Sequence, residues 1–186
     1  GAVTRRVVVE AGDDLAGRFR HLLSNLNGSV DGLVCETLAE TTRTRATPEN
    51  PHRSINRLLE LMARDQIDTL RGVTPIVSRV FNRAAADAIG PESDVDLVVD
   101  RGVLETSTAE YPEALDRADQ LDGFTLYVSP DPVSFGLVLV DEHAYLGAYD
   151  DNGNLVASAD ADGDGDFVSW ARRTFARIRD RSTIRE

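Results

Sequence analysis

The sequence predicts an α/β fold built on a mixed sheet, with parallel crossovers, a C-terminal antiparallel hairpin and a helical N-terminal segment. The first observation is the stretch 124–157, where apolar runs of strand length alternate with short polar turns. The second is the turn 150–153, where Asn-Gly lies between two apolar runs and signals a hairpin. The third is the order from Thr69 onward, in which strand and helix patterns alternate before three strands and a final helix.

The N-terminal segment contains an amphipathic helix with a narrow apolar seam. The residues of this seam are Leu15, Phe19, Leu22 and Leu26. We expect the seam to be the interface of a homodimer, and packing of the same stripe on the chain's own core is the open alternative. Residues 1–40 are therefore predicted to be linker and dimerisation helices, and 41–186 an α/β domain.

The remaining elements follow from periodicity and from turn residues. Alternation and β-branched residues predict strands at 4–10, 41–46, 69–73, 96–99, 124–128, 135–140 and 144–149. Apolar residues at helical spacing, preceded by capping residues or proline, predict helices that begin near Ser29, Asn50, Thr74, Tyr111 and Asp166. The strand 41–46 is expected at a sheet edge. Since 138–140 is apolar at successive positions, its strand is expected to be covered on both faces.

The charge balance is strongly acidic. The chain has 32 acidic and 20 basic residues, a net charge of −12, and no lysine. Such a surface is typical of proteins that work in concentrated salt, where repulsion between carboxylates is screened, so we expect a halophilic cytoplasmic protein. No apolar run of membrane-spanning length and no leader are visible, so no membrane partner is expected. The acidity also argues against direct nucleic-acid binding, because phosphate contacts need clustered positive charge.

The residues that could carry catalysis or bind a metal do not form a complete motif. The run 160–166 is similar to a calcium loop, but Ala171 stands where the bidentate glutamate belongs, so we expect an acidic loop that leads into a helix. The three histidines are far apart, and His143 is expected to be exposed in a turn. Cys35 lies in an apolar pattern and is expected to be a core residue. We therefore expect no enzyme activity, no cofactor and no metal.

The run SFGLVLVDEHAYLGAYD is similar to the active strand of the phospholipase D type of α/β fold, whose pattern is His-x-Lys-x4-Asp. Asp141 stands at the aspartate position. Ser134 stands where the nucleophilic histidine would be, and Gly136 where the phosphate-binding lysine would be. Because both reactive groups are replaced, a phosphohistidine could not form. The resemblance implies a degenerate phospholipase-D-like framework.

A second resemblance concerns an ordered set of segments. The segments are TRATPENPHRSINRLLEL, LRGVTPIVSRVF, EYPEAL, LYVSPDPVSFGLVLVDEHAYLGAYDDNGNLVA and a last helix that contains Trp-Ala. Together they resemble the archaeal regulators that carry the methanogenesis regulatory protein middle domain, which are numerous in haloarchaea. The resemblance implies a transcriptional regulator in which this domain follows a DNA-binding winged helix. TRRVVVEAGDDLAGRFRHLL is similar to the last wing strand and exit helix of such a head. DNA is then a partner only through a head whose recognition helix is not in this chain.

The candidate site is a non-catalytic pocket at the carboxyl ends of the parallel strands. The candidate lining residues are Arg71, Thr74, Ser78, Asp100, Arg101, Ser129, Ser134 and Tyr149. An anionic metabolite is favoured, because a helix that begins near Thr74 offers unpaired N–H groups and Arg71 could hold an anion bidentately. The alternative is that Thr74 is only a helix cap and Arg71 only part of a surface ion pair.

Three functions remain open at this point. The preferred one is the effector-binding and oligomerisation domain of a haloarchaeal winged-helix regulator. The others are a purely structural dimerisation module and a phosphodiesterase-like hydrolase. Binding of a small metabolite would separate the first from the second, and hydrolysis of a phosphodiester would support the third.

Overall fold

The computed structural model describes residues 22, 24, 26 and 35–186, and in this part of the chain eight strands form one mixed sheet in the order β1-β7-β6-β5-β2-β3-β4-β8. The strands are β1 (Thr42–Arg45), β2 (Thr69–Val73), β3 (Asp94–Asp100), β4 (Phe124–Ser129), β5 (Phe135–Val140), β6 (His143–Tyr149), β7 (Leu155–Asp162) and β8 (Thr183–Ile184). The helices are α3 (Cys35–Leu38), α4 (Arg53–Met62), α5 (Arg79–Ala88), α6 (Arg101–Glu110), α7 (Pro112–Asp119) and α8 (Asp166–Asp180).

The sheet has a parallel half and an antiparallel half. β2, β3 and β4 are parallel neighbours, joined by crossovers that contain α5 and then α6 with α7. β5, β6 and β7 form an antiparallel meander, and β5 joins the parallel half by pairing antiparallel with β2. The expected hairpin is therefore present. However, β4 is not its neighbour, because β2 and β3 lie between β4 and β5.

The turn between β6 and β7 follows directly from its sequence. Gly153 has a φ of +79°, a left-handed conformation that costs little only for glycine. The Asp150 carboxylate accepts hydrogen bonds from the backbone N–H groups of Asn152 and Asn154, both at 2.9 Å. The pKa of Asp150 is lowered, chiefly by its backbone hydrogen bond with Asn154. The Asp-Asp-Asn-Gly run thus closes the hairpin as predicted.

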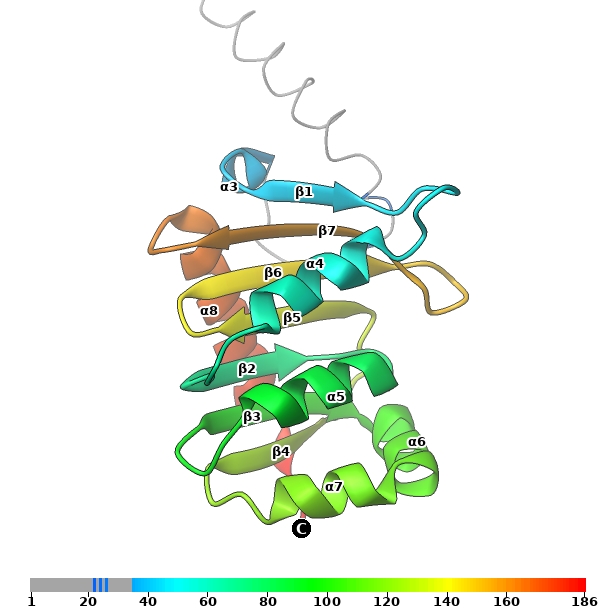
Figure 1. Cartoon of the computed structure of the whole chain (residues 1–186), viewed down its shortest axis with the longest axis vertical. Coiled ribbons are helices and arrows are strands. Elements are labelled where there is room, and N and C mark those ends of the chain that lie inside the picture. Colours follow the sequence, from blue (N-terminus) through cyan, green and yellow to red (C-terminus); the bar gives the residue numbers. More distant parts are fainter. Residues whose placement is uncertain (1–21, 23, 25, 27–34) are drawn as a thin grey trace, which may run out of the picture.

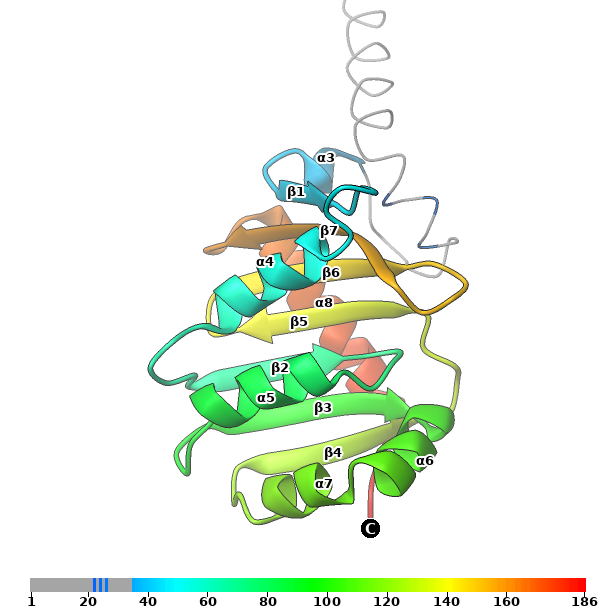
Figure 2. The same cartoon turned by 45° about the vertical axis from the view of Figure 1, so that its right-hand side comes forward.

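Helices cover both faces of the sheet. Figures 1 and 2 show α4, α5 and α7 on one face and α8 on the other. Because successive strand residues point to opposite faces, Val138 belongs to the buried cluster under α4 and α5, whereas Leu137 and Leu139 belong to the cluster under α8. All six residues of β5 are buried, as its continuous apolar run predicts.

The N-terminal seam is described only in part. Leu22 and Leu26 are 1% and 3% exposed and belong to the buried cluster on the α8 face. Leu15 and Phe19 lie outside the described residues, as does the expected strand 4–10. The two described leucines are thus covered by this chain's own core, which is the arrangement left open as the alternative. A homodimer interface on this helix stays a prediction.

The parallel half contains a helix that the sequence did not predict. α6 starts directly after β3, where the backbone N–H of Val103 donates to Asp100 Oδ1 at 2.9 Å. The next difference concerns α5, which begins at Arg79 with Ser78 as its N-cap rather than at Thr74. Because of both differences, the polar groups at the carboxyl ends of β2 and β3 lie elsewhere than the sequence predicted.

Within the described residues, no helix combines the length and apolar character that a membrane span requires.

Candidate ligand-binding site

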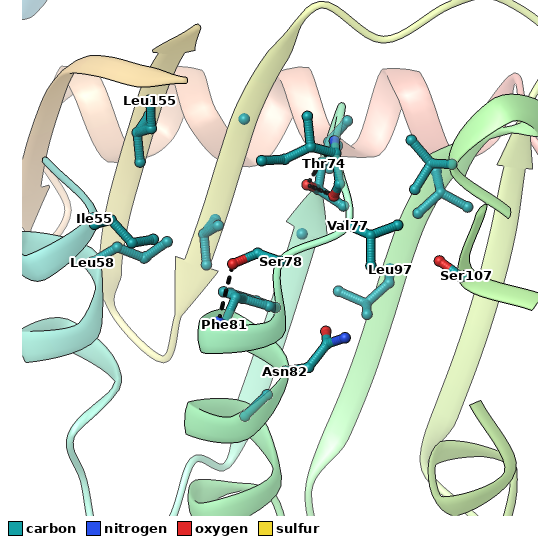
Figure 3. A pocket seen from close by; sticks show the side chains of 18 of the residues that line it. Ile55, Leu58, Thr74, Val77, Ser78, Phe81, Asn82, Leu97, Ser107 and Leu155 are labelled. Carbon is teal, nitrogen blue, oxygen red and sulfur yellow. Dashed lines mark hydrogen bonds between the residues drawn. The ribbon is translucent and has the colours of Figure 1, made fainter. Parts of the chain in front are cut away.

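A cavity of about 790 Å³ lies between the sheet and the helices of its α4–α7 face. Strands β2 to β7 contribute to its lining, and so do the loop before α5 and the helices α4 to α7. Figure 3 shows Ile55, Leu58 and Leu155 on one side of α5 and Val77, Leu97 and Ser107 on the other. The size is ordinary for a small-molecule pocket, for which about 300–1,000 Å³ is usual.

Two glycines shape the strands that line the cavity. A Cβ on Gly72 would come within 2.8 Å of Leu97 Cδ2, and one on Gly136 within 3.2 Å of the Tyr149 ring. Because these positions have no side chain, Leu97 and Tyr149 can lie against the sheet instead of standing away from it.

The loop between β2 and α5 brings two of the predicted hydroxyls to the cavity. Thr74 Oγ1 donates to the carbonyl of Ile76 at 2.8 Å, and Ser78 Oγ accepts from the backbone N–H of Phe81 at 3.2 Å (Figure 3). Both residues line the cavity. Their side chains fix the loop and cap α5, so they act first as structural groups.

Several other polar side chains line the cavity without a hydrogen bond to any described residue. Among them are the amide of Asn82 on α5, the hydroxyl of Ser107 on α6, the hydroxyl of Tyr111 between α6 and α7, and the hydroxyl of Tyr149 on β6. Figure 3 shows the Asn82 amide on the side of α5 that faces Leu97 and Ser107. Burial raises the pKa of Tyr149 to about 12, so its hydroxyl keeps its proton at neutral pH. Each of these groups can donate a hydrogen bond to a bound molecule or accept one from it.

Of the eight residues predicted for the site, Thr74, Ser78 and Tyr149 line this cavity and the other five do not. Asp100 caps α6 and also accepts from the backbone N–H of Val133 at 3.0 Å. Ser129 donates to the carbonyl of Asp131 at 2.9 Å. Asp100 therefore ties the start of α6 to the loop before β5, and Ser129 closes a local turn. Arg101 and Ser134 are exposed.

Arg71 is bound to carboxylates away from the cavity. It donates to Asp94 Oδ2 at 2.7 Å and lies 3.5 Å from Asp96 Oδ2, which α8 also approaches through Arg179. Arg71 alternates along β2 with Leu70 and Gly72, which both line the cavity, so it belongs to the opposite face. Burial raises the pKa of Asp96, and the charge of Arg71 opposes that shift. The predicted anion clamp is thus not formed, and the ion-pair alternative describes Arg71.

A second polar cluster lies at the edge of α4. Asp160 on β7 is 1% exposed and accepts two hydrogen bonds from Arg57 on α4, at 3.0 and 2.8 Å. His143 Nε2 lies 2.8 Å from Asp160 Oδ1. Asp160 holds the pKa of Arg57 above its ordinary value. The prediction that His143 is exposed is wrong: it is the first residue of β6 and its side chain is 13% exposed.

The two sequence motifs that suggested catalysis or metal binding have structural roles. Asp160, the first residue of the calcium-like run, lies in β7 and faces Arg57, so the expected acidic loop begins later, at Gly163. Asp141 has a φ of 51° and its carboxylate accepts from the backbone N–H groups of Asp68 and Thr69, at 3.0 and 2.9 Å. Among the described residues, no three His, Cys, Asp or Glu side chains gather in a way that could hold a metal ion.

Comparison with known proteins shows which family the chain matches and which solved structures it is similar to. The profile of the family described as "Methanogenesis regulatory protein FilR1, middle domain" matches residues 51–181. The chain is similar in structure to TrmBL2, an archaeal chromatin protein with a novel mode of DNA binding. The TM-score is 0.57 at 12% identity, over 99% of this chain and 68% of that chain. It is also similar to NucT from Helicobacter pylori, with a TM-score of 0.56 at 10% identity, over 78% of this chain and 100% of that chain. At these identities both likenesses concern the fold alone. No curated protein matches the chain.

Proposed function

The chain belongs to the family of the FilR1 middle domain, and we propose that its cavity binds a small-molecule effector and reports its presence to a DNA-binding part of an archaeal regulator. The family match establishes a regulatory domain. The effector, the homodimer, the winged-helix head and the halophilic setting belong to the proposal.

The observation that carries the proposal is the cavity itself. Around it, Val77, Leu97, Leu104, Leu115 and Phe124 are only partly buried, although they are apolar. Apolar surface left in contact with water costs roughly 25 cal/mol for each Å². A ligand that covers these side chains would regain part of that free energy, which makes the cavity a favourable place for binding.

The sheet offers a physical route from the cavity to the N-terminal segment. Val138 of β5 lines the cavity, whereas its neighbours Leu137 and Leu139 pack in the cluster on the other face. That cluster also contains Leu22 and Leu26 of the N-terminal segment. A ligand that shifts β5 would therefore act on the packing of the segment to which the proposed head is joined. Such coupling requires that the ligand binds two states of the domain with different affinity.

The proposal is tested by a thermal-shift screen of a metabolite panel in molar KCl. A ligand at a hundred times its Kd should stabilise the fold by about 2.7 kcal/mol. In a Val77→Trp variant the indole should occupy the cavity, so the shift given by a hit should be lost. Val80→Trp is the matched control, because Val80 is 52% exposed and does not line the cavity.

Two outcomes count against effector binding in this cavity. One is a hit whose shift is equal in wild type and in Val77→Trp. The other is a panel without any hit, which would favour the alternative of a purely structural dimerisation module.

A further inference from the structure

We propose that the cavity selects an uncharged, mainly apolar ligand, held at one end by hydrogen bonds from Asn82 and Ser107. This inference rests on the proposed function and names its ligand class. It replaces the anionic metabolite that the sequence favoured. It follows from the charges around the cavity, from its unpartnered polar groups and from its apolar walls.

The cavity offers no buried charge to neutralise an ion. Among the described residues that line it, the ionic side chains are Arg117 and Asp150, and His52 is the one histidine. Arg117 and His52 are exposed, so they belong to the rim. The Asp150 carboxylate is engaged by the N–H groups of its own turn. An anion drawn from water into such a site would lose its hydration without gaining a partner, which strongly opposes binding.

The cation that could have received an anion lies elsewhere. Arg71 belongs to the opposite face of the sheet, where Asp94 and Asp96 hold it. At the N-terminus of α5, Ser78 Oγ already accepts from the N–H of Phe81, one of the groups that an anion would use. The arginine that favoured an anion in the sequence is therefore used by the protein itself, and the helix N-terminus is used in part.

Two of the neutral, unpartnered polar groups of the cavity lie on the Leu97 side of α5, whereas the Tyr149 hydroxyl lies over Gly136 of β5. The Asn82 amide and the Ser107 hydroxyl extend from α5 and α6 into the part of the cavity that Leu97 lines. Neither has a hydrogen bond to another described residue, and an amide offers both a donor and an acceptor. A carboxamide, ketone or alcohol would match them. The apolar side chains of α4, α5 and α7 would cover the remainder of the ligand.

The test compares two probes that share one hydrocarbon skeleton. Cinnamamide is uncharged and carries an amide, whereas cinnamate is an anion at neutral pH. Binding to the full chain is measured for both by ligand-observed NMR titration in molar KCl. We expect cinnamamide to bind and cinnamate to bind at least about tenfold more weakly.

A variant pair locates the polar end. Asn82→Leu should weaken cinnamamide binding about tenfold, through loss of the hydrogen bond. Asn56→Leu is the matched control on α4, because Asn56 is exposed and does not line the cavity, and it should leave binding unchanged. Circular dichroism confirms that each variant is folded, and Ser107→Ala serves if Asn82→Leu does not fold.

The outcomes separate this inference from the proposed function. Equal or tighter binding of cinnamate, no binding of either probe, or equal cinnamamide binding by Asn82→Leu and wild type overturns the inference. An anionic hit from the metabolite panel that Val77→Trp abolishes would also overturn it, yet it would leave effector binding standing. Cinnamamide binding that follows the variant pair supports the ligand class. Cinnamamide binding supports the ligand class even if no metabolite of the panel binds. The absence of a metabolite hit would count against the proposed function alone.

Discussion

The pairing of Arg57 with Asp160 makes a sharp prediction, because the two partners differ in burial. The Asp160 side chain is 1% exposed, whereas that of Arg57 is 29% exposed and has a second partner in Glu60 at 3.2 Å. Removal of Arg57 therefore leaves a buried carboxylate with His143 as its remaining partner. Removal of the Asp160 charge leaves a cation that can reach water. The two substitutions should therefore lower the free energy of unfolding by different amounts.

The magnitudes follow from this asymmetry. Arg57→Met leaves the buried Asp160 carboxylate without its guanidinium partner, and breaking a buried pair in this way lowers the free energy of unfolding by about 3–5 kcal/mol. Asp160→Asn keeps an acceptor for Arg57 and supplies an N–H for His143, so that roughly one charge-assisted hydrogen bond is weakened. We expect it to cost about 1.5–2 kcal/mol. A double variant, Arg57→Met with Asp160→Leu, should be more stable than Arg57→Met alone, because no buried charge is left without a partner.

The assay is urea unfolding in molar KCl, followed by the fluorescence of Trp170. This is the one tryptophan of the chain and it is 3% exposed, so unfolding changes its environment strongly. Arg64→Met is the matched control, since the Arg64–Asp141 pair lies at the surface and should contribute less than about 1 kcal/mol. The reasoning is refuted if Asp160→Asn costs as much as Arg57→Met, or if the double variant is the least stable of the three.

Three further predictions concern the whole domain. Unfolding midpoints should rise from low salt to molar KCl, because the excess carboxylates behind the net charge of −12 repel one another where screening is weak. A midpoint that does not change with salt would contradict the halophile proposal. Burial raises the pKa of Tyr149 to about 12 and that of Tyr145 as well, both from 10.0, so the fold favours their neutral forms. Stability should then fall as pH rises from about 10 toward 12, with Tyr149→Phe showing a shallower loss. The prediction is contradicted if the phenolate absorbance of Tyr149, measured as the difference between wild type and Tyr149→Phe, appears before unfolding. Light scattering should find a dimer that Phe19→Asp converts to a folded monomer, whereas Leu22→Asp should unfold the chain because Leu22 is 1% exposed; a monomeric wild type would exclude the interface.

Much of the fold could be predicted because its strands carry strong local signals. The run 135–140 is continuously apolar, and the turn at Gly153 requires the residue type that the sequence provides. What could not be predicted is α6. Its sequence contains Thr106, Thr108 and a glycine, which have low intrinsic helix propensity. The helix depends instead on the Asp100 cap and on its contacts with β3 and β4, which arise only in the folded chain.

The expected position of the site agrees with the cavity only in part, because the cavity extends over the α4–α7 face of the sheet and includes residues from the first half of the strands, such as Leu70 and Val95. Open α/β sheets place ligands beyond the carboxyl ends of parallel strands, and Thr74 and Ser78 lie there because β2 ends at Val73. Asn82 and Ser107 were missed. Asn82 belongs to no sequence motif, and Ser107 lies on α6, the helix that was not predicted. The sequence did contain a signal against Arg71, since strand alternation gives it the face opposite to Leu70.

The geometry around β5 bears on the hydrolase alternative. The three positions that correspond to the phospholipase D pattern are Ser134, Gly136 and Asp141. Ser134 precedes β5 and Asp141 follows it, so over seven residues at about 3.3 Å each they lie roughly 23 Å apart. Between them, Gly136 is covered by the Tyr149 ring, and Asp141 is engaged with the N–H groups of Asp68 and Thr69. A histidine or lysine restored at one of these positions would therefore lack a partner. In this chain Gly136 instead supports the cavity, because a cavity-lining tyrosine, Tyr149, rests on it.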